Sequence, residues 1–247
     1  MSNNFTANEI TVSRGSEQII CTEFVPDVSG KRPAVILSHG FNSCAAEVED
    51  IAKALAAQGI YALCYDFCGG GNKGRSTGKT TEMSVLTEQE DLRRVIAYVS
   101  DREDTDRIYL YGESQGGFVS ALTAPEYPEM AGLFLVYPAF VIPHDWLSKD
   151  ESELAGEFDF MGVMLSRAYY DGVPRYDVVA KAAEFENPVR IWHGSADTVV
   201  DPSYSLELVK KYKTCELKVF SGLGHWFPSE VRQGVAAEMA EAIGGRV

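Results

Sequence analysis

Short runs of β-branched and aromatic residues alternate with helical patterns along almost the whole chain. This alternation is typical of a mostly parallel β-sheet that is covered by helices on both faces. Residues 10–12 and 19–24, joined through Arg14-Gly15-Ser16, are expected to open the sheet as a hairpin. Six further strands, which bring the sheet to eight, are predicted at residues 34–38, 60–67, 108–111, 132–137, 189–192 and 216–220.

Residues 45–58 carry a clear helical pattern. Their apolar side chains recur at a spacing that places them on one face of a helix, and Gly59 is expected to end it. Further helices are predicted at residues 85–99, 115–124, 204–212 and 228–243. The pattern as a whole predicts a single α/β domain over residues 1–247.

Residues 141–187 interrupt this alternation. Here 47 residues separate two strands that one helix and two short loops would normally connect. Because the segment is rich in aromatic residues, we expect it to pack as a small cap that is inserted after the sixth strand. The seven aromatic residues are Trp146, Phe158, Phe160, Tyr169, Tyr170, Tyr176 and Phe185.

Composition excludes several classes of protein. Of the 247 residues 45% are hydrophobic and 23% are charged, as in an ordinary globular domain, so wholesale disorder, a fibrous repeat and a disulfide-stapled miniprotein are excluded. The net charge of −14 repels polyanions. Nucleic acid and anionic membranes are therefore not expected as partners.

The cellular compartment is predicted from two features. Residues 1–10 lack the basic segment and apolar core of a secretory signal, and the apolar stretch 133–143 is far shorter than the ~20 residues that cross a bilayer. The five cysteines form an odd set without a CxxC pair, which favours reduced thiols. These features predict a soluble, cytoplasmic protein. The cysteines are Cys21, Cys44, Cys64, Cys68 and Cys215.

The strongest chemical motif is Gly112-Glu113-Ser114-Gln115-Gly116, which directly follows a predicted strand and opens a predicted helix. In this context a GxSxG motif is a nucleophile elbow, in which the serine lies on a strained turn and the flanking glycines avoid collisions with neighbouring segments. The start of the helix also offers backbone NH groups and the positive end of a dipole to a developing oxyanion. The motif predicts Ser114 as a catalytic nucleophile.

A serine nucleophile needs a base and an acid residue that orients the base. In this fold they follow in the order acid, then histidine, and His225 comes directly after the last predicted strand. Asp197 follows the preceding strand and is the expected acid, with Asp201 as the alternative. Pro202 next to Asp201 favours a role for Asp201 at the entry of a helix.

The oxyanion hole is expected to use two backbone NH groups. One belongs to Gln115, the residue after the nucleophile, and the other to the loop that follows an early strand. Phe41 is the expected second donor and Asn42 the alternative. His39, which precedes them, is expected to hold the loop by hydrogen bonds.

Signals for cofactors and metals are weak. The segment 74–80 imitates a phosphate-binding loop, but Lys73 stands where the first glycine is required. Cys64 and Cys68 have no nearby pair of histidines, so they do not predict a zinc site, and the histidines lack metal-binding spacing. We therefore expect neither a cofactor nor a metal.

Taken in order, five motifs resemble those of the serine α/β-hydrolase superfamily over nearly the whole chain. They are His39-Gly40-Phe41, the loop from Asp66 to Gly71, the elbow at Ser114, Gly194-x-x-Asp197 and Gly224-His225. More narrowly, the chain is similar to bacterial feruloyl and cinnamoyl esterases, which share an HGF oxyanion loop and a small cap after the sixth strand. The resemblance implies an α/β-hydrolase fold and a carboxylesterase for short acyl or hydroxycinnamoyl esters. It also implies Ser114, Asp197 and His225 as the triad, Phe41 and Gln115 as oxyanion donors, and a small-molecule ester as the substrate.

Two other functions stay open at the level of sequence. An aminopeptidase or amidase can use the same fold, although such peptidases usually carry a large extra domain and an acidic clamp for the substrate amine. A hydrolase-fold protein that binds a ligand without turnover can also keep the triad. The sequence is compatible with a homodimer but does not determine the oligomeric state.

The negative charge is concentrated in the insertion. Residues 141–187 contain ten acidic and four basic residues. We hypothesise that this charge disfavours anionic substrates and helps to expel a carboxylate product, an effect that salt would weaken.

Overall fold

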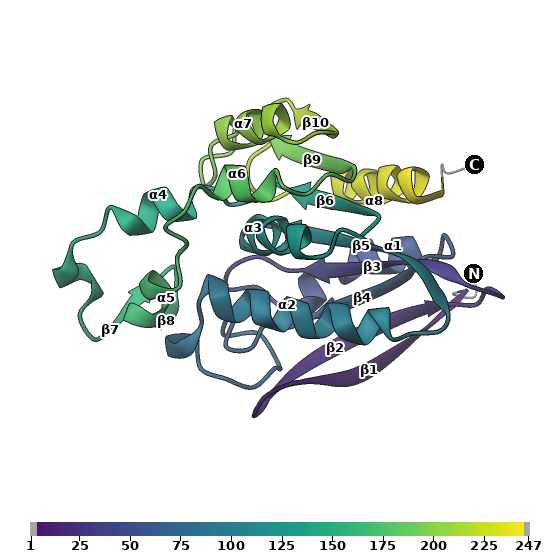
Figure 1. Cartoon of the computed structure of the whole chain (residues 1–247), viewed down its shortest axis with the longest axis horizontal. Helices are drawn as coiled ribbons and strands as arrows, with labels where there is room; N and C mark the ends of the chain where they lie inside the picture. The colour runs from purple at the N-terminus through teal and green to yellow at the C-terminus, as the bar shows by residue number, and fades with distance from the viewer. Residues whose placement is uncertain (1–3, 245–247) are drawn as a thin grey trace.

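An eight-stranded sheet forms the centre of the computed structural model, which describes residues 4–244 (Figure 1). The strand order is β1-β2-β4-β3-β5-β6-β9-β10, and only β2 runs against the others. This confirms the predicted, mostly parallel sheet. The strands are β1 (Phe5–Arg14), β2 (Glu17–Pro26), β3 (Arg32–Ser38), β4 (Tyr61–Tyr65), β5 (Thr105–Glu113), β6 (Gly132–Val136), β9 (Val189–Gly194) and β10 (Cys215–Phe220).

Helices cover both faces of this sheet because the side chains of each central strand alternate between two hydrophobic cores. In β3, Ile36 belongs to one core, whereas Val35 and Leu37 belong to the other. The first core lies under α2 (Val85–Ser100), α3 (Ser114–Thr123) and α7 (Ser203–Lys211). The second lies under α1 (Glu49–Ala56) and α8 (Ser229–Gly244).

Two predicted elements differ most from the structure. The single helix expected over residues 45–58 is wrong, because a 3-10 turn at Ala45–Glu47 precedes α1, which ends at Ala56. The side chain of Asp66 accepts the Ala45 NH at 2.6 Å and holds this entry apart from the helix. The opening hairpin is longer than predicted, since the polar residues of the mostly exposed strand β1 hide its pattern.

The segment 141–187 is here called the cap segment. Its residues up to 171 lie beyond the end of the sheet at which β6 finishes, whereas its last helix, at residues 178–182, packs beside α3 and α7 of the main body (Figure 1). Its two strands pair as a separate antiparallel sheet that the sequence did not predict, because four residues are too few to show a period of two. The elements are α4 (Ile142–Leu147), a 3-10 turn (Glu151–Leu154), β7 (Glu157–Phe160), β8 (Val163–Ser166), α5 (Arg167–Asp171) and α6 (Val178–Ala182).

Hydrogen bonds join the β7–β8 hairpin to loops of the main body. Asn72 donates to the carbonyl oxygen of Gly162 at 2.7 Å, and Thr80 donates to that of Met164 at 2.6 Å.

Between residues 4 and 244 no helix is both long and apolar enough to cross a membrane.

Candidate active site

Ser114 lies at the sharp turn between β5 and α3, where its φ of +51° falls in the left-handed region that non-glycine residues rarely adopt. The turn fits because its neighbours have no side chains. A Cβ on Gly112 would lie 2.3 Å from the carbonyl oxygen of Gly116, and a Cβ on Gly116 would lie 2.3 Å from that of His39. The motif therefore forms the predicted elbow and presents Ser114 at the edge of the sheet.

The structure brings the three predicted triad residues into one hydrogen-bonded chain. The Ser114 hydroxyl lies 2.9 Å from Nε2 of His225, and Nδ1 of His225 lies 2.7 Å from Oδ2 of Asp197. Asp201, the alternative acid, is exposed and its carboxylate instead accepts the backbone NH of Ser203 at 2.8 Å. This is the helix-entry role that Pro202 indicated.

The Asp197 carboxylate is surrounded by hydrogen-bond donors. The backbone NH groups of Val199 and Val200 both reach its Oδ1 at 2.9 Å. Burial on its own would raise the pKa of Asp197, but hydrogen bonds from His193, His225 and the Val200 NH outweigh it and lower the pKa below its usual value. Asp197 is therefore ionised at neutral pH and can orient the imidazole of His225.

His193 supports the acid residue and was not predicted to do so. Its Nε2 lies 3.0 Å from the carbonyl oxygen of Val200 and 3.2 Å from Oδ2 of Asp197. Both of these atoms are acceptors, so Nε2 carries the proton and Nδ1 accepts the hydroxyl of Ser205 at 2.7 Å. The only signal in the sequence is that His193 lies near the end of the strand that leads to Asp197.

The predicted oxyanion loop lies directly beside the nucleophile. A Cβ on Gly40 would lie 3.3 Å from Cβ of Ser114. The fully buried ring of His39 donates from Nδ1 to the carbonyl oxygen of Gly40 at 2.7 Å and accepts the Phe67 NH at 3.2 Å. Burial lowers the pKa of His39, so the ring is neutral and holds the loop, as expected.

A second group of residues that the sequence did not reveal supports the imidazole of His225. The ring of Tyr137 packs against it at a centroid distance of 4.4 Å. The Tyr137 hydroxyl donates to Glu113 at 3.2 Å, and Glu113 also accepts from the Tyr111 hydroxyl and, at 2.6 Å, from Arg232. This network ties the residue before the nucleophile to helix α8.

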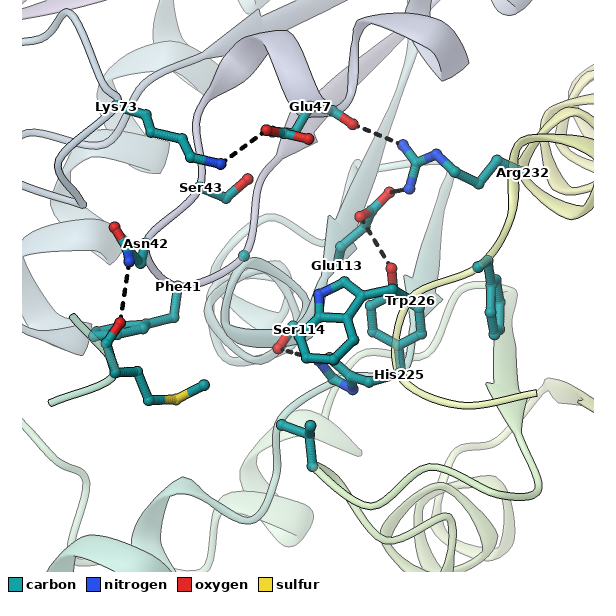
Figure 2. A pocket seen from close by; sticks show the side chains of 15 residues that line it. Phe41, Asn42, Ser43, Glu47, Lys73, Glu113, Ser114, His225, Trp226 and Arg232 are labelled. Atoms are coloured by element: carbon teal, nitrogen blue, oxygen red, sulfur yellow. Dashed lines mark hydrogen bonds and ion pairs between the residues drawn. The ribbon is translucent and has the colours of Figure 1, made fainter. Parts of the chain in front are cut away.

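A pocket of about 450 Å³ opens over Ser114 and His225 (Figure 2). One side is polar and includes the ion pair of Lys73 and Glu47, whose Nζ and Oε1 atoms are 3.1 Å apart. Of the cap segment only Met161 lines the pocket, so none of the ten acidic side chains of residues 141–187 does. The apolar and aromatic lining residues are Phe41, Tyr137, Met161, Val199, Trp226 and Phe227.

No group of three or more His, Cys, Asp or Glu side chains in residues 4–244 is arranged to hold a metal ion.

Asn42, the alternative oxyanion donor, lines the pocket and uses its side-chain amide to bind the carbonyl oxygen of Met161 at 3.1 Å. The side chain of Asn42 therefore joins the oxyanion loop to the cap segment.

The fit of Gly116 generates the first prediction. Substitution Gly116→Ala pushes a methyl group into the backbone of the oxyanion loop, so we expect a loss of about 1–3 kcal/mol in the free energy of unfolding. We also expect most of the activity to be lost, because the shift displaces Ser114 and the loop. Gly234→Ala on α8 is the control, because a Cβ there meets nothing within 4 Å and should stabilise the protein by about 0.5–1 kcal/mol. Urea unfolding measures both. Equal stability of the two variants would contradict the close fit.

The two aspartates near the end of β9 give the second prediction. Asp197→Asn removes the acceptor that fixes the tautomer of His225, so kcat should fall by roughly 10³- to 10⁴-fold. Asp201→Asn changes an exposed helix entry and should leave kcat within about twofold. A similar loss in both variants, measured with an activated ester, would rule out the assignment of Asp197.

Comparison with known proteins indicates the family and the fold of the chain. The family model described as "Serine aminopeptidase, S33" matches residues 29–170, a range that includes Ser114. Two curated Escherichia coli proteins, both described as an uncharacterized 31.7 kDa protein in the traX-finO intergenic region, are 32% identical over 114 residues. That match covers 44% of this chain and 38% of each relative, so the chain spans well under half of their length.

Solved structures share the fold at low identity. Est1E from Butyrivibrio proteoclasticus, solved with ferulic acid bound, has a TM-score of 0.88 at 23% identity, and the match covers 96% of this chain and all of Est1E. A monoacylglycerol lipase from Paleococcus ferrophilus has a TM-score of 0.68 at 18% identity, over 90% of this chain and 98% of the lipase. These matches confirm the predicted α/β-hydrolase fold. Because the family match covers more than half of the sequence, the chain belongs to the α/β-hydrolase family described as serine aminopeptidase, S33.

Proposed function

We propose that this hydrolase is a serine carboxylesterase that cleaves small or aromatic carboxylic esters through an acyl-enzyme on Ser114. The observation that carries the proposal is the chain from Ser114 through His225 to Asp197, with distances of 2.9 and 2.7 Å. A base within hydrogen-bond reach of a serine, and an acid that orients the base, are the requirements for nucleophilic catalysis by a hydroxyl group.

The reaction would follow from this geometry in two halves. Nε2 of His225 takes the proton from Ser114 as Oγ attacks the ester carbonyl, and the backbone NH groups of Phe41 and Gln115 stabilise the oxyanion. His225 then gives this proton to the departing alcohol. In the second half water loses a proton to His225 and attacks the acyl group, which releases the carboxylic acid and regenerates Ser114. Asp197 remains ionised throughout and stabilises the imidazolium.

The charges at the pocket favour esters over peptides with a free amino terminus. An aminopeptidase needs carboxylates that are free to bind an ammonium group. Both oxygens of Glu113 are already bound by Tyr111, Arg232 and Tyr137. The other acidic side chain of the pocket, Glu47, is paired with Lys73.

An aromatic acyl group would suit the apolar side of the pocket. Trp226 follows His225, stands at 90° to its ring and leaves 74% of its own surface exposed, which is unusual for a large apolar side chain. Stacking or edge contacts with a substrate ring would cover this surface. Est1E, which shares the fold, was solved with ferulic acid bound.

Replacement of the nucleophile tests the proposal. Ser114→Ala should reduce hydrolysis of p-nitrophenyl acetate and butyrate by at least roughly 10³-fold while the protein stays folded. The control is Ser195→Ala, because Ser195 lies outside the pocket lining and its hydroxyl accepts the Gly222 NH at 2.9 Å. Wild-type turnover by Ser114→Ala would refute the mechanism. Faster cleavage of aminoacyl anilides than of aryl esters would favour the peptidase, and tight ligand binding without turnover would favour a binding protein.

The exposed ring next to His225 gives a prediction on specificity. Trp226→Ala should raise KM for methyl hydroxycinnamates by roughly 2- to 10-fold, the range expected for one lost aromatic contact. KM for p-nitrophenyl acetate should stay nearly constant, and Trp226→Phe should retain most of the preference. Equal effects on aromatic and acetyl esters would show that Trp226 does not select the acyl group.

A further inference from the structure

The side chain of Gln115 is buried, and it lies in a hydrogen-bonded chain that the proposed mechanism does not use. Its amide nitrogen donates to Oε2 of Glu88 on α2 at 2.8 Å. Its amide oxygen accepts the hydroxyl of Tyr169, which belongs to α5 of the cap segment. The residue after the nucleophile is therefore held from both sides, by the main body and by the cap segment.

Tyr169 also reaches the other proposed oxyanion residue. Its fully buried ring lies edge-on to Phe41 at a centroid distance of 6.2 Å, and Phe160 of β7 contacts the same Phe41 ring at 5.4 Å. Trp146 packs against Tyr169 at 4.5 Å and fixes its position inside the cap segment. One cap residue thus touches the side chains of both residues whose NH groups are assigned to the oxyanion.

We propose that Tyr169 and Glu88 are positioning residues that hold the oxyanion hole in place, so that the cap segment takes part in catalysis without touching the substrate. The inference rests on the proposed esterase mechanism, because it assigns the oxyanion to Phe41 and Gln115. Oxyanion donors act only when they are aimed at the developing charge, and a small displacement costs much of their effect. A bond to each side of Gln115 limits rotation of the first turn of α3.

The burial of Glu88 determines its protonation state. Burial is the largest influence on this carboxyl and raises its pKa to about 8, against a smaller lowering by the hydrogen bond from Gln115. No cation faces it. The titratable groups around it are Asp91 on α2, with Arg14 of β1 bound to Asp91 at 2.6 Å, and the buried hydroxyls of Tyr169 and Tyr65. An ionised Glu88 would place a negative charge one hydrogen bond from the side chain of Gln115, whose NH is assigned to the oxyanion, and would disfavour the transition state.

Removal of one hydroxyl tests the role of Tyr169. Tyr169→Phe keeps the ring and should lower kcat roughly tenfold, less than the loss of a whole oxyanion donor, with KM nearly unchanged. The affinity for a trifluoromethyl ketone, which forms a tetrahedral adduct with Ser114, should fall by the same factor as kcat/KM. The control is Tyr170→Phe on the same helix, whose ring lies over Arg167 and Arg175 and whose kcat should not change.

Glu88→Gln tests the hydrogen bond on the main-body side of Gln115, since glutamine is neutral and still offers an acceptor to Gln115. The wild-type kcat should fall as pH rises through about 8, and this alkaline decline should be absent in Glu88→Gln. Between pH 4.5 and about 8 the Glu88 carboxyl keeps its proton in the folded protein but has lost it in the unfolded chain. The stability of the wild type therefore falls as pH rises across this range. The Tm of Glu88→Gln relative to wild type should therefore increase from pH 5 to pH 8.

The outcomes separate this inference from the proposed function. If wild type hydrolyses esters through Ser114 but Tyr169→Phe behaves like Tyr170→Phe, the positioning role is wrong and the esterase stands. The same alkaline decline of kcat in wild type and Glu88→Gln would show that Glu88 is not the group whose ionisation lowers the activity. Without any ester hydrolysis by wild type, the proposed function itself would fail.

Discussion

The geometry of the site depends on a close backbone approach between the first turn of α3 and the end of β3. Gly116 approaches the carbonyl oxygens of Ser38 and His39 so closely that a Cβ would lie 2.5 and 2.3 Å from them. This approach places the left-handed Ser114 beside Gly40 and brings two parts of the chain, far apart in sequence, to the proposed oxyanion site. The parallel strands then deliver the acid and the histidine to the same edge, as is usual at the carboxyl ends of such sheets. The rest of the site depends on that contact.

Two buried carboxyl groups near Ser114 are held in opposite protonation states by their surroundings. Asp197 is surrounded by donors, so its pKa is lowered and it carries the charge that orients His225. Glu88 has one amide donor and, among the described residues 4–244, no cationic partner, so burial raises its pKa to about 8 and keeps it neutral in the physiological range. In the proposed mechanism the first charge stabilises an imidazolium, whereas a charge on the second would oppose the oxyanion. The proposed mechanism therefore uses one carboxyl group ionised, that of Asp197, and one protonated, that of Glu88.

Much of the fold was predictable because most strands and helices of the main body have a strong local pattern. The sheet, the elbow and the positions of Asp197 and His225 follow from motifs that lie directly after strands. The sequence could not reveal Tyr137, Glu88 or Tyr169, since each acts through a contact with a residue distant in the chain. His193 lies only four residues before Asp197, but the sequence does not show that its ring turns toward that carboxylate. The β7–β8 hairpin was missed because its strands are short. The charge of the cap segment was visible, but its absence from the pocket lining required the structure.

The central claim, that Ser114 is a nucleophile activated by His225, is tested most directly by covalent labelling. A fluorophosphonate should modify the protein at Ser114 alone, as located by peptide mass spectrometry, and esterase activity should fall in proportion to the fraction labelled. Modification at another residue, or full activity in protein whose Ser114 is completely modified, would contradict the account.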